Sequence, residues 1–163
     1  MKYTLEIQKR LLQVENGNLS PHEKALLLKE AIRIADENDD PQWAVEMRLD
    51  LIYELNLLSQ AEEEIAVFSR ILDDYENNKD LISENDILWK YKWICGAAFD
   101  VPEVSQSQID AILEDFKIRT LRNGYSARAY YHLLFLHYNR MRQYDLAKDC
   151  LLYTSDAADD LTR

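Results

Sequence analysis

Glycine and proline are both scarce in this chain, which has three of each among its 163 residues. Alternation of apolar and polar residues, which is typical of half-buried strands, is also rare. A β-sandwich or β-barrel needs many such strands and many turns between them. The sequence therefore favours an all-α protein, and its length suits one domain with a buried core.

Cysteines and long apolar runs are few as well. The two cysteines, Cys95 and Cys150, are too few for a disulfide framework and lack the spacing of metal ligands. No apolar run approaches the roughly 18 residues that a membrane span requires. The first residues, MKYTLEIQKR, contain no signal-peptide segment. These absences predict a cytoplasmic protein that does not bind a membrane.

Basic residues are outnumbered, since 19 Lys and Arg face 30 Asp and Glu and leave a net charge of −11. The imbalance is greatest over residues 41–80, which hold ten acidic and three basic residues. Such a surface repels phosphate backbones, so nucleic acid is not an expected partner. A basic protein or peptide would be attracted to this part of the chain. The alternative is that the charge serves solubility alone.

Helix boundaries are well marked by capping residues. Ser20 and Glu23 fit a capping box with Pro21 at the first helical position. Asp40 fits an N-cap in the same way, with Pro41 as the first residue of the next helix. The stretch LWKYKWI alternates like a strand, but helical patterns flank it and we expect a helix there. The helices form pairs at about 3–37, 41–77, 84–122 and 126–149.

The first helices of these pairs begin about 40 residues apart, near residues 3, 41, 85 and 127. Such a period is typical of a stacked repeat array, in which neighbouring pairs cover the apolar faces that a lone pair leaves open. We expect one domain over residues 1–149, built as a right-handed α-α superhelix of about four antiparallel helix pairs.

The last pair resembles a tetratricopeptide repeat. Tyr131, Leu134 and Tyr138 fall where that family places its first-helix residues, and Tyr144 and Ala147 fall where its second helix has an aromatic and a small residue. The segment SQAEEEIAVFSRIL resembles the second helix too, although Glu64 stands where that family has a small packing residue. Elsewhere, Arg48 stands in place of the large aromatic residue and Phe135 stands where a small residue is usual. The resemblance covers about residues 40–148, and LWKYKW followed by VPEVSQSQI is similar to bacterial proteins of this type.

The end of the chain differs from the rest. The segment CLLYTSDAADD has no continuing apolar period and is similar to a translated transposase adapter of the kind used to prepare sequencing libraries. This predicts that residues 150–163 are foreign and that the natural protein is truncated near Lys148. The alternative is a genuine polar tail, and the codons of the source gene distinguish the two.

The sequence contains no recognisable arrangement of catalytic or metal-binding residues. His132 and His137 are five residues apart, about 140° around a helix, and so cannot converge on one metal. Cys95 lies on an apolar helix face, as expected of a buried structural thiol rather than a nucleophile. The carboxylates of Glu62–Glu64 are expected to face solvent near a helix N-terminus. We therefore expect neither an enzyme nor a bound cofactor or metal.

The resemblance implies a ligand-binding surface. In tetratricopeptide arrays the first helix of each pair lines the concave groove, where fixed Asn and Arg donors and rigid aromatic rings bind a peptide. The corresponding positions in this chain are Glu46, Tyr53, Asn56, Lys90, Trp93, His132, Asn139 and Arg140.

Some of these residues also have ordinary structural explanations. Trp89 and Trp93 lie four apart and could form an aromatic shelf, but such pairs usually pack between helices and we expect both in the core. Arg140 is expected to pair with a neighbouring acid rather than clamp a ligand.

Three functions are therefore open. The first is a non-enzymatic scaffold that binds a protein or peptide on its concave surface. The second is the N-terminal regulatory or structural domain of a longer bacterial protein, whose activity lies in a missing part. The third is an enzyme built on a helical repeat, for which no residues stand out.

Overall fold

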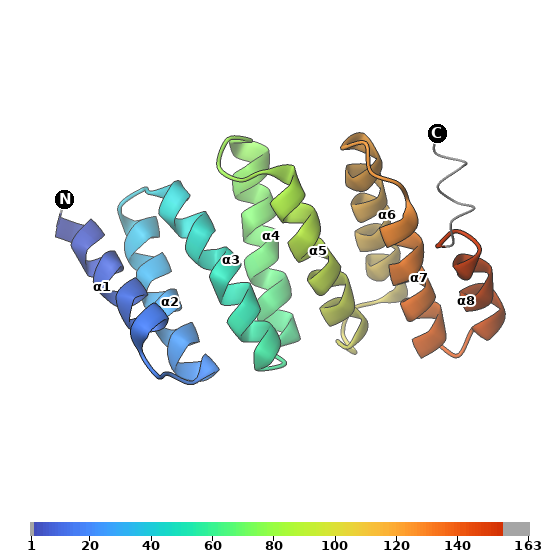
Figure 1. Ribbon diagram of the computed structural model, residues 1–163, viewed down its shortest axis with the longest axis horizontal. Coiled ribbons are helices and arrows are strands. Elements are labelled where there is room, and N and C mark those ends of the chain that lie inside the picture. Colours follow the sequence, from blue (N-terminus) through green and yellow to red (C-terminus); the bar gives the residue numbers. More distant parts are fainter. Residues whose placement is uncertain (1, 155–163) are drawn as a thin grey trace. The chain divides into compact units, whose positions relative to one another are not determined.

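Residues 2–154 are described by the computed structural model of the chain, and in that part every regular element is an α-helix (Figure 1). The elements are α1 (Lys2–Asn16), α2 (Pro21–Glu37), α3 (Pro41–Leu57), α4 (Ala61–Asn77), α5 (Glu84–Phe99), α6 (Gln106–Arg122), α7 (Arg128–Arg140) and α8 (Tyr144–Leu151). The ambiguous stretch LWKYKWI lies inside α5, so its interpretation as helix is confirmed.

Helices α2 and α3 begin where their capping residues predict. Ser20 accepts a hydrogen bond from the backbone amide of Glu23, and the Glu23 carboxylate accepts one from the Ser20 amide at 2.8 Å. Ser105 and Gln108 form a second capping box at the start of α6. These bonds satisfy amides that the first helical turn leaves without intrahelical acceptors.

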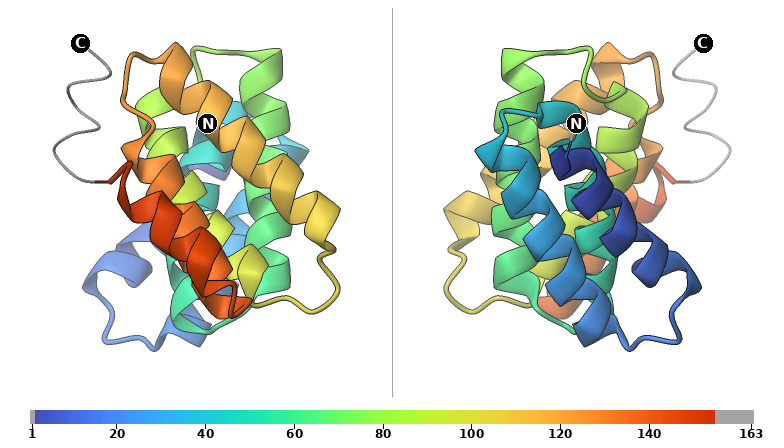
Figure 2. Two further views of the ribbon diagram at one scale, coloured as in Figure 1. Left: turned by 90° about the vertical axis from the view of Figure 1, so that its right-hand side faces the viewer. Right: turned by 90° about the vertical axis from the view of Figure 1, so that its left-hand side faces the viewer.

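The chain divides into two compact units, a first up to Ser83 and a second from Glu84 on. In the first, α2 packs against α1 and α3, and α3 packs against α4. In the second, α5 packs against α6 and α7, and α7 packs against α8. Figure 2 shows α1 beside α2 in one view and α7 beside α8 in the other. This serial packing within each unit confirms an all-α, solenoid-like fold.

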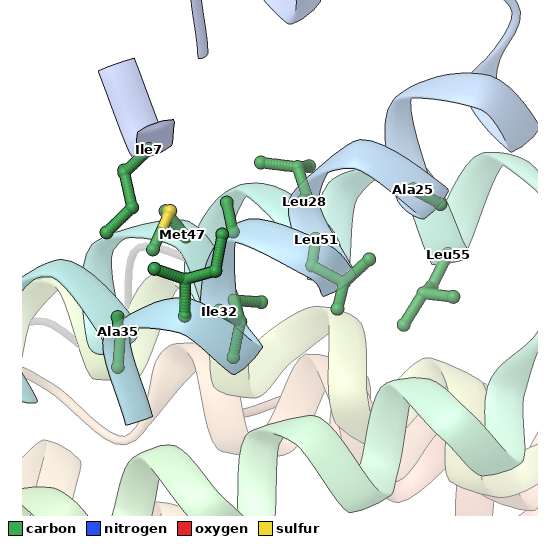
Figure 3. Close-up of a cluster of buried hydrophobic side chains, with 11 residues drawn as sticks. Ile7, Ala25, Leu28, Ile32, Ala35, Met47, Leu51 and Leu55 are labelled. Carbon is green, nitrogen blue, oxygen red and sulfur yellow. The ribbon is translucent and has the colours of Figure 1, made fainter. Parts of the chain in front are cut away.

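The core of the first unit lies between its first three helices. Figure 3 shows Ile7 of α1 near Met47 of α3, with Leu28 of α2 beside Leu51 of α3. The α2 residues at this core recur every three or four positions, which keeps them on one face of the helix. Ala25, Leu28, Ile32 and Ala35 are all buried and form the apolar stripe of α2.

The second unit has its own buried contacts. The rings of Tyr91 on α5 and Phe116 on α6 lie 5.5 Å apart between centroids. The Tyr91 hydroxyl donates to Asp115 at 2.8 Å, so the polar end of this buried side chain is satisfied. On α8, Ala147 is 3% exposed, as close helix packing requires, whereas Tyr144 points to solvent.

Two expectations about individual side chains are wrong. Trp89 is 61% exposed rather than packed in the core. Glu64 is 1% exposed rather than solvent-facing, and it accepts from the Asn56 side-chain amide at 3.4 Å. Glu64 lies on the face of α4 that meets α3, where its carboxylate reaches Asn56 of that helix.

The predicted foreign segment begins inside a helix. Cys150 is buried within α8, and Leu151 is the last residue of that helix. Residues 155–163, which make up most of the segment, lie outside the described residues. The origin of the segment stays a prediction that the source gene can test.

Candidate functional site

Three predicted groove residues lie on α3 in the first unit. Glu46 and Asn56 are exposed, and each is already held by a neighbour: Gln42 donates to Glu46 at 2.7 Å, and Asn56 donates to Glu64. Tyr53 leaves 46% of its surface in water. Of the three, Tyr53 offers the largest apolar area to a partner.

The other five predicted residues lie on α5 and α7 in the second unit. Lys90 and Trp93 of α5 are half-buried, with the ammonium 4.8 Å from the indole centroid. This contact is a cation–π pair within one helix. The two side chains therefore form one local surface on α5.

On α7, His132, Asn139 and Arg140 are exposed. The Arg140 guanidinium pairs with the Asp100 carboxylate at the end of α5, so the expected partnership with a neighbouring acid is confirmed. His132 lies four residues from Leu136 and lines a pocket that the other two residues do not reach.

That pocket lies in the second unit and has a volume of about 700 Å³. It opens between α5, α6 and α7, and most of its wall is apolar. Phe116 and Thr120 of α6, which are almost fully buried, are part of its lining. Trp89 of α5 and Leu136 of α7 line it while remaining partly in water.

The charged residues that line this pocket are basic. Lys92 of α5 and Arg128 of α7 are both in the lining, and no Asp or Glu accompanies them. The Lys92 ammonium lies 4.8 Å from the centroid of the Trp89 ring. The wall also contains Ser126 and Ala129, so it includes the first turn of α7.

Sequence reasoning missed this pocket because it placed Trp89 in the core. The buried residues of α5, among them Ile87, Tyr91 and Ile94, form one stripe. At 100° per residue, Trp89 lies about 160° from the middle of that stripe. This angular position indicates that Trp89 faces away from the core. It could have been read from the sequence, and it is better evidence than the general tendency of aromatic pairs to be buried.

The buried thiol of Cys95 is inert in its surroundings. It is fully buried on α5, and burial, with the nearby Asp115 carboxylate, raises its pKa to about 12. A nucleophilic cysteine needs a lowered pKa and access to substrate. The expected burial of Cys95 is therefore confirmed.

Within residues 2–154, no group of three or more His, Cys, Asp or Glu side chains is placed to hold a metal ion. None of the helices in that part has both the length and the hydropathy needed to cross a membrane.

Comparison with known proteins gives no relative. No protein-family model matches the chain, and searches of curated proteins and of solved structures return no match.

Proposed function

We propose that the chain is a non-enzymatic, tetratricopeptide-like cytoplasmic scaffold that binds a protein or peptide. Its binding surface would be the face lined by the first helix of each pair, which is concave in tetratricopeptide arrays. Serial helix packing in each unit and the repeat-like residues of α7 and α8 support this proposal.

The observation that carries the proposal is the exposure of large aromatic side chains on first helices. Tyr53 of α3 is 46% exposed and Trp89 of α5 is 61% exposed, while Trp93 is half-buried. Exposed Trp and Tyr cost a folded chain solubility without adding to its core. The same residue types dominate the energetics of protein interfaces because they bring rigid apolar area at little entropic cost.

A peptide selection tests this proposal. A random peptide library is selected on the wild-type protein, and the affinity of each recovered peptide is measured by calorimetry. Peptides that bind the proposed surface should lose about thirtyfold in affinity with Tyr53→Ala or Trp93→Ala, the size of an interface hot spot. The double variant Asn139→Ala/Arg140→Ala tests the polar part of the surface in the same way.

Matched controls lie on second helices. Leu26 of α2 and Ile118 of α6 are 53% and 52% exposed, and Leu26→Ala and Ile118→Ala should leave peptide affinity unchanged. Recovered peptides that bind every groove variant as tightly as the wild type, or that depend on the control positions instead, would contradict the proposal.

A further inference from the structure

We propose that the pocket between α5, α6 and α7 binds a small amphipathic anion, a carboxylate joined to an apolar body. This site goes beyond the proposed peptide-binding surface, because the two share Trp89 and His132 while the rest of the pocket lining lies outside the predicted groove residues. Its argument rests on the size, the apolarity and the charge of the pocket wall.

Size and apolarity point to a small molecule. Pockets for small ligands commonly measure between about 300 and 1,000 Å³ and are lined mainly by apolar side chains with a few polar groups. This pocket, at about 700 Å³, is lined by Leu88, Phe116, Leu133 and Leu136 with Trp89 at its side. An alkyl chain of about eight carbons is small enough for a cavity of this volume.

The positive charge of the pocket wall favours a ligand with an anionic head group. The whole chain carries −11, yet the charged side chains at this pocket are Lys92 and Arg128. In the part of the chain that the structure describes, no carboxylate pairs with Lys92, whose ammonium lies against Trp89. A ligand carboxylate beside this ammonium would accept a hydrogen bond between opposite charges, whereas an alcohol offers only a neutral acceptor and an alkylammonium offers none.

The first turn of α7 adds to the same preference. Its N-cap residue is Ala127, the Ser126 hydroxyl accepts from the Arg128 amide at 3.4 Å, and Ala129 of that turn lines the pocket. A helix N-terminus carries a partial positive charge from its unpaired amides, which favours a nearby anion. Positive charge from α5 and from α7 therefore meets at one apolar cavity.

Octanoate is the ligand used for the test, and 1-octanol and octylammonium are comparison ligands of equal chain length. Calorimetry should show octanoate binding at a 1:1 ratio, about tenfold more tightly than 1-octanol, and no binding of octylammonium. Lys92→Gln should reduce octanoate affinity about tenfold and leave 1-octanol affinity unchanged. Trp89 emission should shift on octanoate addition, and Trp89→Phe should remove that shift.

Lys148→Gln is the matched control, since Lys148 is an exposed residue of α8 and its substitution changes the charge equally. Leu136→Trp should fill the cavity and abolish binding of octanoate and 1-octanol, with circular dichroism checking the fold. Equal binding of octanoate and octylammonium, equal loss in the two lysine variants, or no octanoate binding would overturn the proposal. A dimer of the wild type that Leu136→Trp dissociates would assign the pocket to a second copy and would overturn it too.

Discussion

His137 is a buried histidine on α7 whose ring contacts two other segments of the second unit. Its ring centroid lies 4.9 Å from that of Phe99, and Gln106 lies within hydrogen-bond distance of its Nε2 at 3.0 Å. Burial lowers the pKa of His137, opposed by the Asp110 carboxylate and reinforced by the Arg140 guanidinium. The folded protein therefore holds this imidazole in its neutral form over a wider pH range than the unfolded chain does.

The pH dependence of stability should show the lowered pKa of His137. The unfolded chain protonates His137 near its ordinary pKa of 6.5, and the folded protein protonates it at a lower pH. Between these two values the unfolded state binds more protons, so stability falls as the pH is lowered through that window. Thermal unfolding followed by circular dichroism between about pH 7.5 and 5.5 should show a smaller loss in His137→Gln than in the wild type.

The exposed His132 on the same helix is the control for this measurement. His132→Gln should keep the wild-type dependence on pH. If the two glutamine variants and the wild type lose stability in parallel as the pH falls, the lowered pKa of His137 does not contribute to the pH dependence of stability.

At the scale of elements, Arg48 connects three helices of the first unit. Its guanidinium, carried by α3, pairs with Asp36 of α2 at 2.6 Å and with Asp74 of α4 at 3.4 Å. The Arg48 side chain is 9% exposed and that of Asp74 is 13% exposed, so removing this cation takes the buried partner from a largely buried carboxylate and leaves it only the exposed Arg70. Loss of one partner from a buried pair costs more than the pair itself contributes.

Arg48→Met should therefore destabilise the protein by about 3 kcal/mol in urea unfolding. Arg70→Met is the matched control, because Arg70 also pairs with Asp74, at 3.2 Å, but is 59% exposed. Exposed pairs contribute about 0–1 kcal/mol, so this variant should remain close to the wild type. Equal losses in the two variants would refute the role of Arg48 as a buried bridge.

The elements themselves could be predicted from sequence to a large extent. Capping residues act within one turn, so Ser20 and Ser105 indicate helix starts without knowledge of any contact. The burial of polar residues could not be predicted in this way. Arg48 and Glu64 are inside because residues of neighbouring helices, Asp36 and Asn56 among them, pair with them there. Such partners are set by tertiary packing.

The candidate site was predicted less well than the helices. Resemblance to a repeat family places residues on a helix face, but it does not show which ones a neighbour already binds. Arg140 and Asn56 are held by Asp100 and Glu64, while the pocket beside Trp89 depends on how three helices meet. A cavity is a property of packing between helices and leaves little trace in any one of them.

At the scale of the whole molecule, charge is divided unequally between the two units. Residues 1–83 contain 18 acidic and 9 basic residues, whereas residues 84–163 contain 12 and 10. Most of the net charge of −11 is therefore carried by the first unit. A field of one sign attracts ligands of the opposite sign before any specific contact forms.

This division predicts that the two units bind ligands of opposite charge. A lysine-rich peptide carrying a photo-crosslinker should label the first unit preferentially, as mass spectrometry of the cross-linked peptides can show. Raising the salt from about 0.05 to 0.5 M should abolish the labelling, because the attraction is screened over a few ångströms at high ionic strength. Octanoate should leave the labelling unchanged, since the basic pocket belongs to the second unit. Labelling spread evenly over both units, or insensitive to salt, would show that the acidic surface serves solubility and does not select a basic partner.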